Sequence, residues 1–170
     1  EGASGSFFDL FVMLANPNDT DADVSITFLL PDGTTRVKDY LVAAGSRLNI
    51  WVDQEEIPAG SGEHPLADTA LSTRVRVTNG VPIVVERAMW WPGPTPATWQ
   101  EAHASAGATA TGTLWALAGG EEGGPDNAST FAVVANTSSR AGRIKVTWVY
   151  DDGQQASSEF DLLPESRFNV

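Results

Sequence analysis

The sequence predicts an all-β fold, in which an antiparallel β-sandwich module is followed by a second, partial copy of itself. Apolar residues recur in short alternating runs divided by Gly, Pro, Asn and Asp, and helical spacing is nearly absent. Residues 131–170 also align with residues 11–50 at an offset of 120 without a gap. Nine of the forty aligned pairs are identical, and they fall mainly at turns and strand ends, so the repeat is one of folding pattern.

Short strands with regular turn signals are typical of an immunoglobulin-like (Ig-like) sandwich. We expect a module over 1–118, an acidic glycine-rich linker over 119–127 and a partial repeat over 128–170. The expected strands are 7–16, 22–30, 34–43, 46–52, 69–78, 81–91, 108–118, 128–136, 142–150, 155–163 and 166–170. Residues 53–68 are rich in Gly, Pro and acidic residues and are expected to form a loop.

Three turns are marked by glycine. Gly33 and Gly153 follow aspartate at equivalent places in the two copies, and each is expected to take the positive φ of a tight hairpin turn. Asn79 and Gly80 predict a third two-residue hairpin, which would set Val75 opposite Val84. Glu86 would then share a face with both valines.

An arginine recurs at a strand start in both copies, as Arg47 and Arg167. A residue kept in both copies suggests a structural partner, because a site for one ligand need not appear twice. The register above makes Glu86 the candidate partner of Arg47. The sequence therefore predicts a buried structural ion pair between Arg47 and Glu86.

Composition bounds the possible partners. The net charge is −12, and only two lysines occur, which argues against binding to nucleic acid or to anionic membrane surfaces. No apolar run is long enough to insert into a membrane. The chain has no cysteine, so disulfides and thiolate chemistry are excluded. Neither a nucleophile elbow nor the spacing of a catalytic triad is present, and we expect no enzyme and no resident cofactor.

Two groups of residues are candidate ligand sites. Asp19, Asp21 and Asp23 place carboxylates at alternate positions, as calcium ligands often are, but the loop lacks the glycine and distal glutamate of an EF-hand. The second copy replaces all three, which favours a solvated acidic turn over a weak calcium site.

The other group consists of Trp90, Trp91 and Trp99 around three prolines. A stiff loop that presents tryptophan faces suits sugar rings or the apolar surface of a partner protein. The alternative is a rigid corner whose rings pack on the end of the sandwich.

The phrases FVMLANP, TFLLPDGT, SRLNIWVD, NGVPIVVERAMWW and ATATGTLWALAGG together resemble uncharacterised tandem β-sandwich repeats of large bacterial secreted or cell-surface proteins. The resemblance covers residues 7–118 once and 128–170 in part. It implies a stalk, adhesion or assembly role outside the cell, and it brings no catalytic residues.

The partial copy has apolar strand faces that need a cover, either from neighbouring repeats of the same chain or from another copy. We therefore expect a non-catalytic extracellular structural module, such as a stalk, surface-layer or filament subunit, that joins head to tail by β-sheet completion. The alternative is a carbohydrate-binding or adhesion module that uses the exposed tryptophans.

Overall fold

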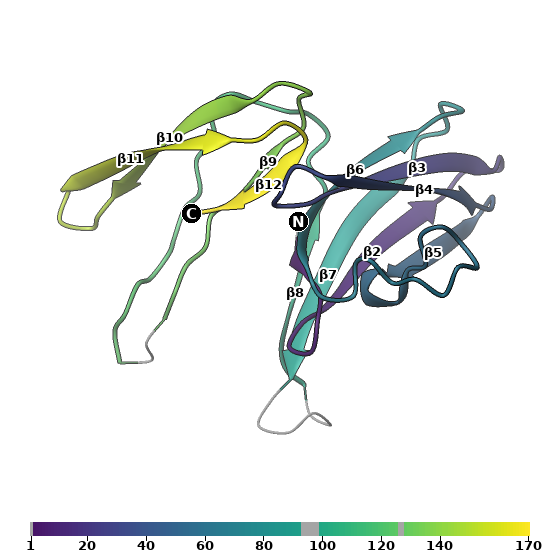
Figure 1. The fold of residues 1–170 in the computed structure, drawn as a ribbon, viewed down its shortest axis with the longest axis horizontal. Coiled ribbons are helices and arrows are strands. Elements are labelled where there is room, and N and C mark those ends of the chain that lie inside the picture. Colours follow the sequence, from purple (N-terminus) through teal and green to yellow (C-terminus); the bar gives the residue numbers. More distant parts are fainter. Residues whose placement is uncertain (1, 93–98, 126–127) are drawn as a thin grey trace.

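A computed structural model describes residues 2–92, 99–125 and 128–170. Its first part is a sandwich of two antiparallel four-stranded sheets, with strand orders β1-β6-β3-β4 and β5-β2-β7-β8 (Figure 1). The elements are β1 (Gly2–Ala3), β2 (Asp9–Asn16), β3 (Ala22–Leu29), β4 (Thr35–Val42), β5 (Ser46–Trp51), the 3-10 helix η1 (Val52–Gln54), β6 (Ala70–Val77), β7 (Val84–Pro92) and β8 (Trp99–Ala106). The all-β prediction is confirmed. In the described part of the chain, no helix has the length and apolarity to cross a bilayer.

Period-two alternation decides which residues form the core. In β2, Leu10, Val12 and Leu14 are buried between the sheets, and the residues between them face outward. The two inner faces interlock as in other sandwiches. The core cluster is Leu10, Val12, Leu14, Ala22, Val24, Ile26, Phe28, Leu30, Val42, Ile50, Val52, Leu66 and Leu71.

The predicted hairpin at Asn79 and Gly80 is wrong. β6 pairs with β1 and β3, whereas β7 pairs with β2 and β8, so residues 78–83 cross from one sheet to the other. The Asn79 side chain serves this crossing: it accepts from the Asp23 N–H (3.2 Å) and donates to the Asp21 carbonyl (2.8 Å). Gly80 has a φ of 78°, which suits a turn, but the turn does not join adjacent strands.

Strand assignment fails at the end of the first module. The strand expected over 108–118 is absent. Those residues are exposed and pair with none of the described strands. β8 forms instead from residues 99–106, which are rich in Ala and were not expected to form a strand. A segment of strand-forming residues becomes a strand only where it pairs with the edge of another strand. In this structure residues 99–106 pair with the edge of β7, and residues 108–118 do not.

The second copy repeats the register of the first. Its strands are β9 (Val133–Asn136), β10 (Gly142–Val149), β11 (Gln155–Leu162) and β12 (Ser166–Asn169). All eight residue pairs of β10 with β11 are those of β3 with β4 shifted by 120. The four pairs of β12 with β9 are likewise pairs of β5 with β2 shifted by 120. The turn glycines match as well, with φ of 81° at Gly33 and 82° at Gly153.

The second copy contacts the first beside the turn between β3 and β4. Arg74 on β6 donates to the Thr137 carbonyl and forms an ion pair with Glu165, both at 3.1 Å. The Arg167 N–H donates to the Leu30 carbonyl at 3.4 Å. β9 and β12 therefore lie near the first sandwich, while the β10–β11 hairpin extends away from it (Figure 1).

Candidate functional site

Three aromatic rings stack across the outer face of the second sheet, and we call them the aromatic ladder (Trp51, Phe11 and Trp90). The ring centroids of Phe11 and Trp51 are 5.6 Å apart and those of Phe11 and Trp90 are 4.5 Å apart, with interplanar angles of 18° and 15°. The Trp51 indole N–H donates to the Asp9 carboxylate at 3.0 Å. The rings come from β5, β2 and β7, so the ladder ties three strands together.

The ladder is only partly available to a flat ligand. Phe11 stacks with a ring on each side, whereas Trp51 at the end of the row stays 43% exposed. Trp90 and Trp91 are adjacent in a strand and point to opposite sides of the sheet. Trp91 meets Phe8 edge to face with centroids 6.0 Å apart, and the Trp99 side chain lies outside the described residues.

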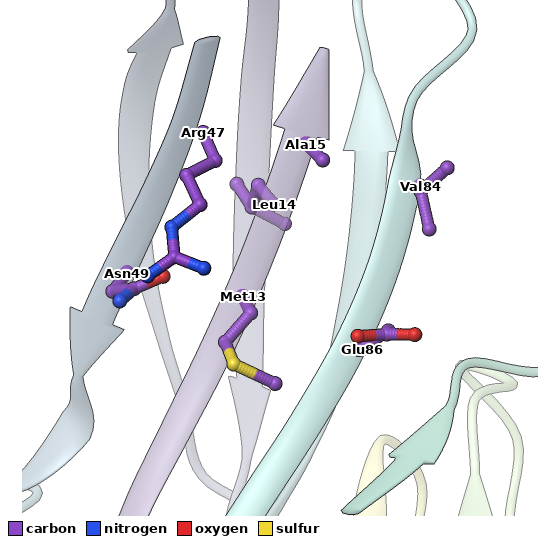
Figure 2. A pocket seen from close by; sticks show the side chains of 7 residues that line it. All are labelled: Met13, Leu14, Ala15, Arg47, Asn49, Val84 and Glu86. Carbon is purple, nitrogen blue, oxygen red and sulfur yellow. The ribbon is translucent and has the colours of Figure 1, made fainter. Parts of the chain in front are cut away.

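A shallow depression of about 110 Å³ lies on the same outer face (Figure 2). This volume is well below the roughly 300–1,000 Å³ of pockets that bury small-molecule ligands. Arg47 and Glu86 line it from β5 and β7, with Met13 of β2 between them.

The predicted buried ion pair between Arg47 and Glu86 is wrong. Both side chains are exposed, and no ion pair joins them. The two residues do share a face, but they lie on strands separated by β2. The prediction failed because it rested on a pairing of β6 with β7, whereas β7 pairs with β2.

The repeated arginine has different surroundings in the two copies. Arg47 faces solvent on the outer side of β5, whereas Arg167 is buried beside the β3–β4 turn of the first sandwich. What Arg47 and Arg167 share is the pairing of their backbone, opposite Ala15 and Ala135. The recurrence therefore reports the strand register and not a common side-chain partner.

The three aspartates proposed as calcium ligands are exposed and take part in turn structure. The Asp21 carboxylate accepts from the Ala44 N–H at 2.8 Å, and the Asp23 carbonyl accepts from the Thr78 N–H at 2.8 Å. Asp19 accepts from the Thr20 hydroxyl. Within residues 2–92, 99–125 and 128–170, no three acidic, histidine or cysteine side chains gather as a metal would require.

Asn16 and Asn136 occupy equivalent positions in the two copies, and each holds the loop that follows it. The sequence patterns did not mark either residue as functional. Asn16 is buried, and its amide donates to the carbonyls of Thr20 and Val42 at 2.8 and 3.0 Å. Its side-chain oxygen accepts from the Asn18 N–H at 3.1 Å. The signal was present, because this asparagine is one of the nine identities between the copies.

Asp53 is a buried carboxylate that anchors the N-terminal segment. Its two oxygens accept from the backbone N–H groups of Gly5 and Leu10, at 2.9 and 3.2 Å. Burial raises the pKa of Asp53, and these two hydrogen bonds oppose the rise without cancelling it. η1 positions the residue, directly after the apolar end of β5.

Glu55 binds two side chains of the edge strand β4. Its carboxylate accepts from the Lys38 ammonium at 2.6 Å and from the Tyr40 hydroxyl at 2.7 Å. Burial raises the pKa of Tyr40, and the hydrogen bond to Glu55 adds to the rise. The loop over 53–68, which the sequence marks only as polar, thus carries the group that covers this edge.

The largest contrast within the chain is the exposure of the second copy. Residues that are buried at the end of β3 have exposed counterparts at the end of β10. The pairs are Phe28 and Trp148 (0% and 37% exposed), Leu29 and Val149 (0% and 68%), and Leu30 and Tyr150 (8% and 53%). In the first copy this region is covered because β6 pairs with β3 and β7 lies on the facing sheet. Strands equivalent to β6 and β7 are not among residues 131–170.

Comparisons with known proteins give little. No protein-family model matches the chain, and no curated protein matches it. A solved crystal structure, described as that of Thermotoga maritima 1070, is similar with a TM-score of 0.46 and 19% identity, over 59% of this chain and 76% of that chain. A likeness at this level does not bear on function.

Proposed function

We propose that this chain is a non-catalytic structural module whose copies join by β-sheet completion. The observation that carries the proposal is the second copy, which keeps the strand register of the first while its apolar faces remain exposed. The same strand pairs form in both copies, but their apolar faces are buried only in the first. The exposed faces of the second copy are therefore suited to binding further strands.

The energetic argument favours a cover over permanent exposure. Burying one large apolar side chain fully stabilises by roughly 1.5–3 kcal/mol. Trp148, Val149 and Tyr150 are still 37%, 68% and 53% exposed, so completing their burial offers about 2–5 kcal/mol in all, which approaches the lower end of the net stability of a domain. Soluble proteins rarely leave large apolar side chains and the adjoining strand edges open together.

The same proposal places the protein outside the cell, in secreted form or on the surface, because the repeats that it resembles belong to such proteins. Its strong negative charge suits a solvated assembly unit and not a nucleic-acid partner. Within a longer array the covering strands would come from neighbouring repeats, and between separate chains they would come from another copy.

The test adds the missing strands. Val170 is the equivalent of Ile50, so a second copy of residues 51–106 joined after Val170 would continue the repeat in phase. We expect the extended chain to complete a second sandwich and to bind a hydrophobic dye several-fold less than the original chain. The control carries Val75→Asp and Val85→Asp in the added copy only, which places charge on its inward faces. Dye binding that is equally strong in the original and extended chains would contradict the proposal.

A further inference from the structure

The two copies meet through a joint made of unlike surfaces, which we call the filled joint. On the first copy, the turn between β3 and β4 (residues 30–34) is the socket. On the second copy, the turn between β11 and β12 (residues 163–167) is the plug. The Arg167 N–H of the plug donates to the Leu30 carbonyl of the socket at 3.4 Å. A Cβ atom at Gly33 would lie 3.5 Å from the first leucine of the plug, so the two turns are in van der Waals contact.

The second copy carries a socket of its own, the open socket (residues 150–154). Tyr150 and Gly153 stand there in the positions of Leu30 and Gly33. In both turns the glycine N–H donates to the carbonyl three residues earlier, at 3.2 Å in the first copy and 3.0 Å in the second, so the backbone surfaces are alike. Tyr150 is 53% exposed, whereas Leu30 is 8% exposed. The open socket lies at the tip of the hairpin that extends away from the first sandwich (Figure 1).

The first copy likewise carries a plug of its own, the open plug (residues 43–47), between β4 and β5. The two plugs follow a similar backbone path, since Gly45 has a φ of 60° and Glu165, at the same position, has a φ of 43°. Arg47 at the end of the open plug is exposed, whereas Arg167 is only 8% exposed in the filled joint. The open plug is therefore the counterpart of a surface that the filled joint buries.

Socket and plug lie at opposite ends of each copy. β4 begins at the socket and ends at the open plug, and β11 begins at the open socket and ends at the plug. The filled joint lies between the two open surfaces, which are at the two ends of the molecule (Figure 1). The open plug of a chain is therefore out of reach of its own open socket.

The open surfaces differ from the filled joint in a matched way. Arg74 and Glu165 form an ion pair across the filled joint at 3.1 Å. None of the described strands of the second copy corresponds to β6, which carries Arg74, and the open plug has Gly45 in the position of Glu165, so neither surface presents one half of this pair alone. The open socket also gains a carboxylate, Asp151, which complements the charge of Arg47 on the open plug.

We propose that the open plug of one chain enters the open socket of a second copy of this chain, and so repeats between chains the joint observed within one. This inference deepens the proposed function, on which it rests, by naming the surfaces through which separate copies meet. The Arg47 N–H donates to the Tyr150 carbonyl, and Gly153 lies against Ala43, as their counterparts do in the filled joint. Plug and socket are different surfaces, so the contact is head to tail and extends into an open chain of copies.

Disulfide formation tests this proximity directly, because the chain has no native cysteine. One chain carries Ala43→Cys in the open plug, another carries Gly153→Cys in the open socket, and the two are mixed and oxidised. We expect a covalent dimer of the two different chains, formed at least tenfold faster than when Val37→Cys replaces Ala43→Cys. Val37 is exposed towards the other end of the same strand. Equal rates would mean random collision and would overturn the inference.

The filled joint supplies the matched control for a cysteine at this turn position. Gly33 and Gly153 have φ of 81° and 82°, so cysteine strains both turns equally. A Cβ atom at Gly33 would lie 3.5 Å from the Leu163 Cβ, which is within the range for a disulfide. A single chain with Gly33→Cys and Leu163→Cys should therefore form the disulfide within itself. If it does not, the filled joint is contradicted, and the inference with it.

Sedimentation over a range of concentrations gives a readout that leaves both turns unchanged. We expect the unmodified chain to grow in mass with concentration, and Arg47→Asp to weaken association at least tenfold, because it brings a second carboxylate to Asp151. The matched control, Arg76→Asp, changes the charge equally on the exposed outer face of β6 and should leave association unchanged. An unmodified chain that stays monomeric, or an Arg47→Asp chain that associates normally, would refute the contact between open plug and open socket.

The two proposals fail separately. If Arg47→Asp abolishes association while the chain extended by residues 51–106 keeps its exposed apolar surface, the joint between chains stands and completion of the second sandwich does not. If the extended chain loses its dye binding while Arg47→Asp associates normally, completion of the second sandwich stands and the copies do not meet through the open plug and open socket.

Discussion

Asn16 and Asn136 make the same contacts in the two copies. The Nδ2 of each donates to the carbonyl four residues later, that of Thr20 or of Arg140, at 2.8 Å in both cases. Each side-chain oxygen accepts from the N–H two residues later, at 3.1 and 3.0 Å. The loop after β2 and the loop after β9 are thus built by one local rule, independent of what surrounds them.

Replacing Asn16 by alanine should destabilise the protein by about 1–3 kcal/mol, because buried carbonyls lose their donor and the Asn18 N–H loses its acceptor. Asn136→Ala removes equivalent bonds at a more exposed site, where water can replace them, and should cost less. Urea unfolding of both variants measures the difference. Equal losses of unfolding free energy in Asn16→Ala and Asn136→Ala would show that the burial of these hydrogen bonds does not determine what they contribute.

Glu165 and Gly45 occupy equivalent turn positions with φ of 43° and 60°. A side chain in this left-handed region costs roughly 1–2 kcal/mol, so Gly45→Ala should destabilise the protein. Glu165→Gly should relieve the strain at its own site but also remove the ion pair with Arg74, which is worth about 0–1 kcal/mol at this exposure. Comparing Glu165→Gly in the original chain and in an Arg74→Gln background separates the two effects. If thermal unfolding showed that Gly45→Ala and Glu165→Gly lower the melting temperature equally, this account would be contradicted.

Asp53→Asn should cost roughly 1–3 kcal/mol, since an amide can accept only one of the two N–H bonds from Gly5 and Leu10. The pKa of Asp53 is raised in the folded state, so the protonation-linked stabilisation is full below about pH 3.9 and is lost as pH rises through the raised pKa. The difference in the free energy of unfolding between the original chain and the variant should therefore narrow as pH rises from about 3.9 through the raised pKa of Asp53, and urea unfolding at a series of pH values measures it. A gap that widens with pH would reverse the sign of the argument.

Tyr40 should make the protein sensitive to alkali. Its pKa is raised by burial and by Glu55, so the folded chain keeps a proton that the unfolded chain releases above about pH 10. The stabilisation is present below that pH and is lost as pH rises further. Tyr40→Phe removes this dependence, and its free energy of unfolding should fall less steeply above pH 10. Parallel curves for the two proteins would exclude Tyr40 as the source.

Local patterns in the sequence predicted the repeat and its hairpins well. The Asp-Gly turns at Gly33 and Gly153 lie within ten residues of the strands that they join, and the alternation of β3 settled which side is buried. Short-range geometry of this kind depends on few other residues. The offset of 120 carried the same information to the second copy.

Partner choice between distant strands was not predictable in the same way. The Asn79-Gly80 pair is a strong hairpin signal, yet β6 and β7 pair with β3 and β2, which already offered well-matched edges. The interpretation of Arg47 and Glu86 failed with that register. Asp53 and Glu55 escaped notice because their partners lie far away in the sequence, and a polar loop gives no sign of which carboxylates it buries.

The second copy also has a meaning for the order of folding. Its two strand pairs close shorter loops than the pairs that cover the first copy: the β3–β4 and β2–β5 pairs begin 6 and 30 residues apart, whereas the β3–β6 and β2–β7 pairs begin 43 and 69 residues apart. The entropy cost of closure grows with loop length, so we expect short-range pairs to form before β6 and β7 join them. Residues 131–170 hold the same short-range pairs that we expect the first sandwich to form early. One chain therefore carries both these pairs alone and the finished sandwich built around them, so the two can be compared under the same conditions.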